Sequence, residues 1–209
     1  MLVPSIDTAV AHIRRDAEAG RLEGWGQSTL IDEFTGVPSI ERELFDTLHA
    51  AAGLTATFPV GNAGVLHVYG YWFSEVPTPF GYKRDRWADG ALAQALGLDP
   101  AAFHLTEGTT PTAETSGTTL LERVTAAVLP LLITPPADAH TADIVVDDQL
   151  TRVVALPALP GRSSVLIYGS APLAAPAAMR LITTFPVASD PAALVAECVA
   201  TPRRRFNAA

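Results

Sequence analysis

The apolar residues between positions 6 and 17 recur every three or four positions, which is the spacing of one face of an α-helix. Ser5 precedes this stretch as a cap, and Gly20 follows it as a stop signal. A second amphipathic helix is predicted to open within residues 38–43, where Ser39 can cap it. The first quarter of the chain therefore predicts two helices.

Residues 55–58 and 65–74 are rich in threonine, valine and aromatic residues, which favour β-strands. The segment between them, residues 59–64, contains proline, glycine and asparagine and is predicted to turn. A short helix is predicted over residues 89–98, and a longer apolar helix over residues 118–132. The middle of the chain is thus expected to contribute a strand pair followed by two helices.

The second half of the chain changes to short β-branched runs separated by turn residues, at positions 144–146, 152–156, 165–168 and 180–185. This pattern predicts an antiparallel meander, after which Asp190 and Pro191 open a final helix. We therefore expect an α+β fold, with N-terminal helices and further helices packed on a mainly antiparallel sheet that includes a C-terminal β-meander. At 209 residues, the whole chain (1–209) is expected to form one domain.

Composition supports a folded, soluble protein. The chain is 48% hydrophobic and 17% charged, which is too apolar for a disordered chain, and it has no apolar run long enough to span a bilayer. The N-terminus shows no basic region followed by an apolar stretch, so a cytoplasmic location is expected. The single cysteine, Cys198, cannot form an intrachain disulfide and lies in an apolar pattern typical of a buried thiol.

The formal net charge of −8 opposes general affinity for nucleic acid, which is bound largely through neutralisation of phosphates. No two histidines are spaced three or four residues apart, so no metal site is predicted. The glycine-rich phosphate and dinucleotide fingerprints are absent, and no cofactor is predicted. The expected partner is a small anionic ligand, and nothing in the sequence indicates the oligomeric state.

Residues 67–87 concentrate the polar chemistry of the chain. They hold the only lysine, Lys83, together with three of the four tyrosines and two of the three tryptophans. If residues 65–73 form a strand, His67, Tyr69 and Tyr71 share one face at spacings of about 7 Å. His67 is then a candidate acid or base, with Tyr71 as a catalytic partner and Tyr69 orienting the substrate. The alternative is that all three are ordinary structural residues of a strand.

The strand is predicted to break at residues 78–81, and a basic cluster follows. Lys83, Arg84 and Arg86 repel one another, and Asp85 alone cannot neutralise them, so an anionic ligand is predicted here. Lys83 is also a candidate catalytic amine. The predicted substrate-binding set is Tyr69, Tyr82, Arg84 and Arg86. Alternatively, this is a solvated loop whose cations pair with surface carboxylates.

Asp32 and Glu33 could supply an acid or base if they fold against this segment, although such carboxylates commonly cap helices or face solvent. The segments at residues 24–26, 59–64, 67–71 and 78–87 resemble those of a group of actinobacterial proteins labelled amino acid deaminases. The resemblance covers the first half of the chain. It implies an amino acid carboxylate bound by Arg84 or Arg86, with His67 as the base.

These observations predict an enzyme of the hydrolase or lyase type, in amino acid metabolism, that acts on a small polar anionic metabolite. The alternative is a non-catalytic ligand-binding or protein-interaction module. A catalytic His67 should face a concave pocket with Tyr71 and a cation, whereas a recognition patch should be convex. A further alternative is a ribonuclease-toxin-like protein, suggested by residues 180–186 and opposed by the acidic charge.

Overall fold

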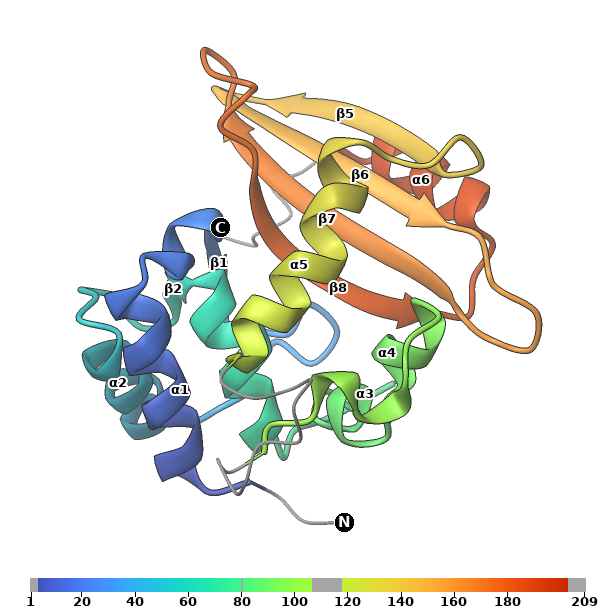
Figure 1. The fold of residues 1–209 in the computed structure, drawn as a ribbon. Helices are drawn as coiled ribbons and strands as arrows, with labels where there is room; N and C mark the ends of the chain where they lie inside the picture. Colours follow the sequence, from blue (N-terminus) through green and yellow to red (C-terminus); the bar gives the residue numbers. More distant parts are fainter. Residues whose placement is uncertain (1–3, 80, 107–117, 203–209) are drawn as a thin grey trace.

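A computed structural model describes residues 4–79, 81–106 and 118–202 of the chain (Figure 1). It combines helices with antiparallel sheets and ends in a four-stranded antiparallel meander, which confirms the predicted α+β class. In Figure 1 the N-terminal helices lie to one side of this meander, and they are joined to it through α5 and the edge strand β8.

The first helix, α1 (Ile6–Glu18), begins as predicted, because the Ser5 hydroxyl accepts a hydrogen bond from the Thr8 amide at 3.1 Å. Gly20 adopts the left-handed conformation after it, with φ of 67°. The second helix, α2 (Arg42–Ala51), starts later than predicted, and Glu41 rather than Ser39 is its N-cap residue. Ser39 is buried instead, and its hydroxyl donates to the Leu30 carbonyl.

The prediction of a strand over residues 65–74 is wrong. The chain forms a π-helical turn, η2 (Gly64–Tyr69), followed by a 3₁₀ turn, η3 (Gly70–Phe73). Their side chains are buried on nearly every side, so no apolar period marks them as helical, and a short buried apolar run is ambiguous between helix and strand. The Asn62 side chain starts the turn, because its oxygen accepts hydrogen bonds from the amides of Gly64 and Val65.

The prediction of a strand over residues 55–58 was also wrong. The strand pair is formed by β1 (Gln27–Thr29) and β2 (Val60–Asn62), and β2 lies inside the segment that was predicted to turn. Residues 55–58 form only an isolated bridge, from Thr57 to Val60. The other short elements of the first half are η1 (Arg21–Gly24), β3 (Pro77–Thr78), β4 (Gly81–Tyr82), α3 (Asp85–Ala88), α4 (Ala91–Ala95) and η4 (Pro100–Phe103).

The C-terminal meander is confirmed, with strands longer than predicted. It runs in the order β5 (His140–Val146), β6 (Gln149–Leu156), β7 (Ser164–Pro172) and β8 (Arg180–Val187), each antiparallel to the next. Helix α5 (Leu120–Ile133) crosses one face of the sheet, and α6 (Pro191–Ala200) covers the other (Figure 1).

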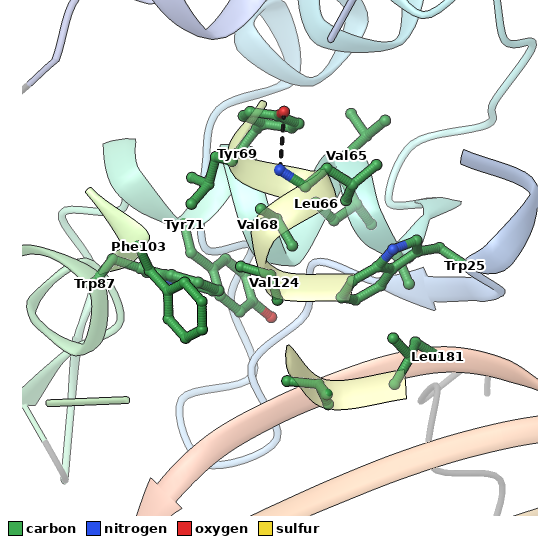
Figure 2. Packing of buried hydrophobic residues seen from close by; sticks show 14 of the residues in the cluster. Trp25, Val65, Leu66, Val68, Tyr69, Tyr71, Trp87, Phe103, Val124 and Leu181 are labelled. Carbon is green, nitrogen blue, oxygen red and sulfur yellow. Dashed lines mark hydrogen bonds between the residues drawn. The ribbon is translucent and has the colours of Figure 1, made fainter. Parts of the chain in front are cut away.

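The sheet and the N-terminal elements share a core. One cluster of buried side chains extends from Ala9 of α1 to Leu181 of β8, and a smaller cluster lies under α6. Trp25 forms an isolated bridge with Leu181, and Figure 2 shows the two side chains near each other. This junction places η2 against the edge strand β8, where His67 of the polar segment 67–87 is found.

Candidate functional site

His67 lies in η2 with both ring nitrogens hydrogen-bonded. Nδ1 is 2.7 Å from the Ile182 carbonyl oxygen of β8, and Nε2 is 2.9 Å from the Ser28 hydroxyl of β1. A carbonyl oxygen can only accept, so Nδ1 carries the proton and Nε2 accepts the hydrogen bond from Ser28. The pair therefore has the geometry of a hydroxyl nucleophile next to a base, with a third group that fixes the orientation of the base.

The pKa of His67 falls from its ordinary value of 6.5 to about 3. Burial is the largest cause, because it disfavours the charged ring, and the nearby charges of Lys83 and Arg86 lower the pKa further. The hydrogen bond to Ile182 opposes this shift in part. The imidazole is therefore neutral near pH 7, with the lone pair of Nε2 directed at Ser28.

Tyr71 and Lys83 contact His67 or each other, which brings the three predicted catalytic residues together. The rings of His67 and Tyr71 stack at 4.8 Å with an angle of 26° between their planes. The Lys83 Nζ atom lies 4.5 Å from the centre of the Tyr71 ring and 3.3 Å from its hydroxyl oxygen. A helical turn, which places residues four apart on one side, produces the stacking that a strand would not.

Lys83 is buried and paired. Its Nζ atom lies 3.1 Å from the Asp32 carboxylate and donates to the Ser39 hydroxyl at 2.8 Å. The same carboxylate accepts hydrogen bonds from the amides of Phe34 and Thr35, each at 3.0 Å. Burial acts to raise the pKa of Asp32, but the charge and hydrogen bond of Lys83 and these two amides together lower it.

Arg86 adds a second cation to this group. It is half-buried, its guanidinium lies 5.1 Å from the centre of the Phe185 ring, and it forms no hydrogen bond or ion pair within the described ranges. Burial lowers the pKa of Arg86, and electrostatic interactions with Tyr71 and Asp32 partly counter this effect. Two cations, Lys83 and Arg86, therefore act on one carboxylate, so the group carries an excess positive charge.

Tyr82 and Arg84 lie apart from the His67 group, at the surface. Tyr82 is 37% exposed, and the Arg84 guanidinium stacks over its ring at 4.8 Å. Arg84 also forms ion pairs with Glu75 at 3.8 Å and with Asp85 at 3.6 Å. For Arg84, the structure therefore matches the alternative of a cation paired with surface carboxylates.

Residues 67–87 also hold several buried donors that make no hydrogen bond, one of which, Arg84 Nε, forms only the ion pair with Asp85 at 3.6 Å. Across the part of the chain that the structure describes, six buried side-chain N or O atoms have no hydrogen bond. Four of them belong to Trp72, Ser74, Arg84 and Trp87, and each carries a hydrogen that can be donated. Buried polar atoms are rarely left unpaired, so this segment is rich in donors that an acceptor could satisfy.

Tyr69 belongs to a different buried network. Its hydroxyl donates to the Asp16 carboxylate at 2.5 Å and accepts from the Leu121 amide at 3.3 Å, the bond drawn as a dashed line in Figure 2. Thr119 donates to the other oxygen of Asp16, and Arg21 lies 3.6 Å from it. Burial raises the pKa of Asp16 more than these hydrogen bonds and Arg21 lower it. Tyr69 thus joins α1 to the start of α5.

Sequence reasoning missed Asp16 and Ser28. Asp16 follows Ile13 by three positions and therefore lies on the apolar face of α1, where a carboxylate is unusual. A carboxylate at that position indicates a buried polar network and could have been recognised in the sequence. Ser28 sits in an irregular stretch with no motif around it, so only the fold reveals that it meets His67. Asp32 was considered conditionally, and it does fold against the central segment through Lys83.

We expect Tyr69→Phe to lower the free energy of unfolding by about 1–3 kcal/mol, because the buried Asp16 carboxyl and Leu121 amide each lose a partner. Urea unfolding of the variant measures this loss. Tyr82→Phe is the matched control, since an exposed hydroxyl should change stability by less than about 0.5 kcal/mol. Equal stability of the two variants would contradict the structural role of Tyr69.

Two hollows in the described residues have the volume of a small-molecule site, and neither is lined by His67, Tyr71 or Lys83. One, of about 510 Å³, follows α5 from Thr125 to Thr134, and the other, of about 380 Å³, lies beside β1 and β2. Neither of these two hollows is therefore the concave pocket expected around a catalytic His67. No helix of the described ranges is long and apolar enough to cross a membrane. Within the same ranges, no group of three or more His, Cys, Asp or Glu residues could hold a metal ion.

Comparison with known proteins gives no relative from which a role could be transferred. No protein-family model, curated protein or solved structure matches the chain.

Proposed function

We propose that the protein is a hydrolase that acts on a small anionic metabolite, with Ser28 as the nucleophile and His67 as the general base. The observation that carries the proposal is the hydrogen bond of 2.9 Å from the Ser28 hydroxyl to Nε2 of His67. The Ile182 carbonyl supports it, because it holds the imidazole in the tautomer that can accept the serine proton.

The chemistry proceeds by acyl transfer. The Ser28 oxygen forms a bond to the substrate carbonyl carbon while its proton moves to Nε2 of His67. His67 then gives that proton to the leaving amine or alcohol as the bond from carbon to the leaving group breaks. The oxygen of a water molecule then forms a bond to the acyl carbon while His67 accepts its proton. His67 gives this proton to the Ser28 oxygen as the bond from the acyl carbon to that oxygen breaks, which releases the acid.

Ser28 and His67 form the proposed catalytic dyad. The excess positive charge of Lys83 and Arg86 beside this dyad supports an anionic substrate. Arg86 has no carboxylate partner in the described ranges, and a guanidinium suits a carboxylate bidentately. Tyr71 lies between His67 and Lys83, where its hydroxyl can bind the same anion. A bound anion would also weaken the effect of Lys83 and Arg86 on His67 and raise its pKa toward the range useful for a base.

Substrate entry requires a conformational step. Ser28 is 3% exposed and His67 is 6% exposed, so side chains must move before a ligand reaches them. The segment from β3 to α3 is the element we assign to this motion. It carries Lys83 and Arg86, and the strand pairing of its described residues is the two-residue ladder between β3 and β4. Opening it would expose the dyad and the two cations together.

Covalent labelling tests the nucleophile. We expect a fluorophosphonate probe to add once to the folded protein and peptide mass spectrometry to place the adduct on Ser28. Ser28→Ala should abolish labelling, while Ser189→Ala, which removes an exposed serine of the loop after β8, should leave it unchanged. A folded wild-type protein that takes no label, or a Ser28→Ala variant that is still labelled, would overturn the proposal.

The anionic substrate class has a separate test. A panel of N-acyl amino acids and their methyl esters should be hydrolysed with preference for the free carboxylates. Arg86→Gln should reduce that preference mainly through KM, because it removes a charge that binds the substrate before the chemical step. A preference unchanged by this substitution would place the anion elsewhere.

A further inference from the structure

The hollow beside β1 and β2 lies on the opposite side of β1 from the dyad. It has a volume of about 380 Å³ and is bordered by the segment after α2, by both strands and by the start of β8. Gln27 of β1 lines it, whereas the next residue, Ser28, is buried and bonds to His67. Alternate residues of a strand point to opposite faces, so the hollow and the dyad are separate spaces.

One wall of the hollow is preformed, because hydrogen bonds fix the ring of His49. The ring of His49 donates from Nδ1 to the Phe45 carbonyl at 2.9 Å and accepts the Asn62 amide at Nε2 at 3.2 Å. Gly61 lets the backbone of β2 approach this ring, because a β-carbon there would lie 2.2 Å from Nε2. Both nitrogens of His49 are thus used by the wall, and burial lowers its pKa.

Four other polar side chains border the hollow and remain unengaged. Gln27, Thr55, Thr57 and Arg180 line it, and their side chains form no hydrogen bond or ion pair in the described part of the chain. Arg180 is the only side chain of the lining with a full charge at neutral pH, and no carboxylate lines the hollow. In a chain with a net charge of −8, this is a local positive site.

The rest of the lining is apolar, with Leu54, Ala56 and Val60 near the threonines. A ligand that fits would place a negative group on the Arg180 fork and an aliphatic body against these side chains. Hydroxyl and amide groups of Thr55, Thr57 and Gln27 could then donate hydrogen bonds to the remaining lone pairs of the two carboxylate oxygens. A hollow of this volume holds one small metabolite.

We propose that this hollow is a binding site for a small aliphatic carboxylate, held by Arg180, and that it is distinct from the proposed catalytic dyad. The proposal does not depend on the hydrolase function, because none of its residues is Ser28, His67 or Arg86. An occupant would lie one residue along β1 from Ser28.

Nuclear magnetic resonance titration tests the site. Isovalerate, 2-oxoisovalerate, lactate and leucine are each added to the labelled wild-type protein, and isovaleramide serves as the uncharged isostere of isovalerate. We expect at least one carboxylate to shift the backbone amides of Gln27, Thr55 and Thr57 in a saturable manner, and isovaleramide to shift them far less. A panel in which no carboxylate moves these amides would overturn the proposal.

Substitutions test whether Arg180 is the residue that binds the carboxylate. Arg180→Gln should weaken binding about tenfold or more, because the charge-assisted pair with the carboxylate is lost. Arg14→Gln removes the same charge from the exposed face of α1 and should bind as the wild type does. Binding that survives Arg180→Gln overturns the assignment. Ser28→Ala should bind the carboxylate normally, so failure of the hydrolase proposal and failure of this one are separate results.

Discussion

Replacement of Lys83 by methionine is expected to lower the free energy of unfolding by about 3–5 kcal/mol. The substitution keeps most of the side-chain volume and removes the charge that faces the Asp32 carboxylate at 3.1 Å. Asp32 is 5% exposed, so its charge would then be buried without its ion-pair partner. Urea unfolding at neutral pH measures the loss.

The double variant separates the charge from the packing. Asp32→Asn combined with Lys83→Met removes both charges, and the amide oxygen can still accept hydrogen bonds from the Phe34 and Thr35 amides. We expect it to recover most of the loss. Arg84→Met, whose partner Glu75 is highly exposed, should cost less than about 1 kcal/mol. A Lys83→Met loss no larger than that of Arg84→Met would show that the buried pair does not stabilise the fold.

Acidification is expected to unfold the protein well above the pH at which most carboxylates are protonated. The pKa of His12 is lowered to about 4 and that of His67 to about 3, in both cases mainly by burial, and burial also lowers the pKa of His49. The rings of His12 and His67 stay neutral in the folded protein down to these pKa values, whereas in the unfolded chain they become charged below their ordinary value of 6.5. The pKa of His49 is shifted in the same direction.

The number of protons bound by the folded and unfolded states decides how the free energy of unfolding changes with pH. Between pH 6.5 and the folded pKa values, the unfolded state holds more protons, so stability falls as the pH falls. His12 and His67 together should cost on the order of 4 kcal/mol between about pH 7.5 and pH 5, and His49 adds to this loss. Asp16 acts in the opposite direction, because its pKa is raised in the folded state, so acid favours the folded form at that site.

Urea unfolding at a series of pH values tests this dependence. His67→Gln and His12→Gln should each reduce the slope of unfolding free energy against pH by about 1.4 kcal/mol per pH unit, whatever their effect at neutral pH. His140→Gln, which changes an exposed ring of β5, should leave the slope unchanged. A free energy of unfolding that is flat from neutral pH down to about pH 5 would contradict the prediction.

The sequence was most informative where apolar periodicity meets a capping residue. Helix α1 begins after Ser5, α6 begins after Asp190, and both cap side chains accept backbone hydrogen bonds as expected. The meander was readable because β-branched runs alternate with turn residues. The region from residue 55 to 74 was not readable, because Asn62 and the surrounding core impose a helical turn on residues that individually favour strands.

The candidate site was likewise predictable from the sequence only in part. The segment from His67 to Trp87 was located by its composition, and the structure does bring His67, Tyr71 and Lys83 together. The wrong strand prediction placed Tyr69 beside them, whereas the helical turn directs Tyr69 to Asp16. Contacts between distant parts of the chain, such as Ser28 with His67, leave no local pattern in a single sequence.

The hydrogen bond from His67 to Ile182 joins residues 115 positions apart. During synthesis the ribosome therefore releases His67 long before the carbonyl that fixes its tautomer exists outside the exit tunnel. Trp25 is made even earlier, and it can pack against Leu181 only after β8 has been made. A nascent chain that lacks β8 has the serine and the histidine but lacks the third member that orients them. The proposed dyad of Ser28 and His67 would thus become competent only after β8 has been made.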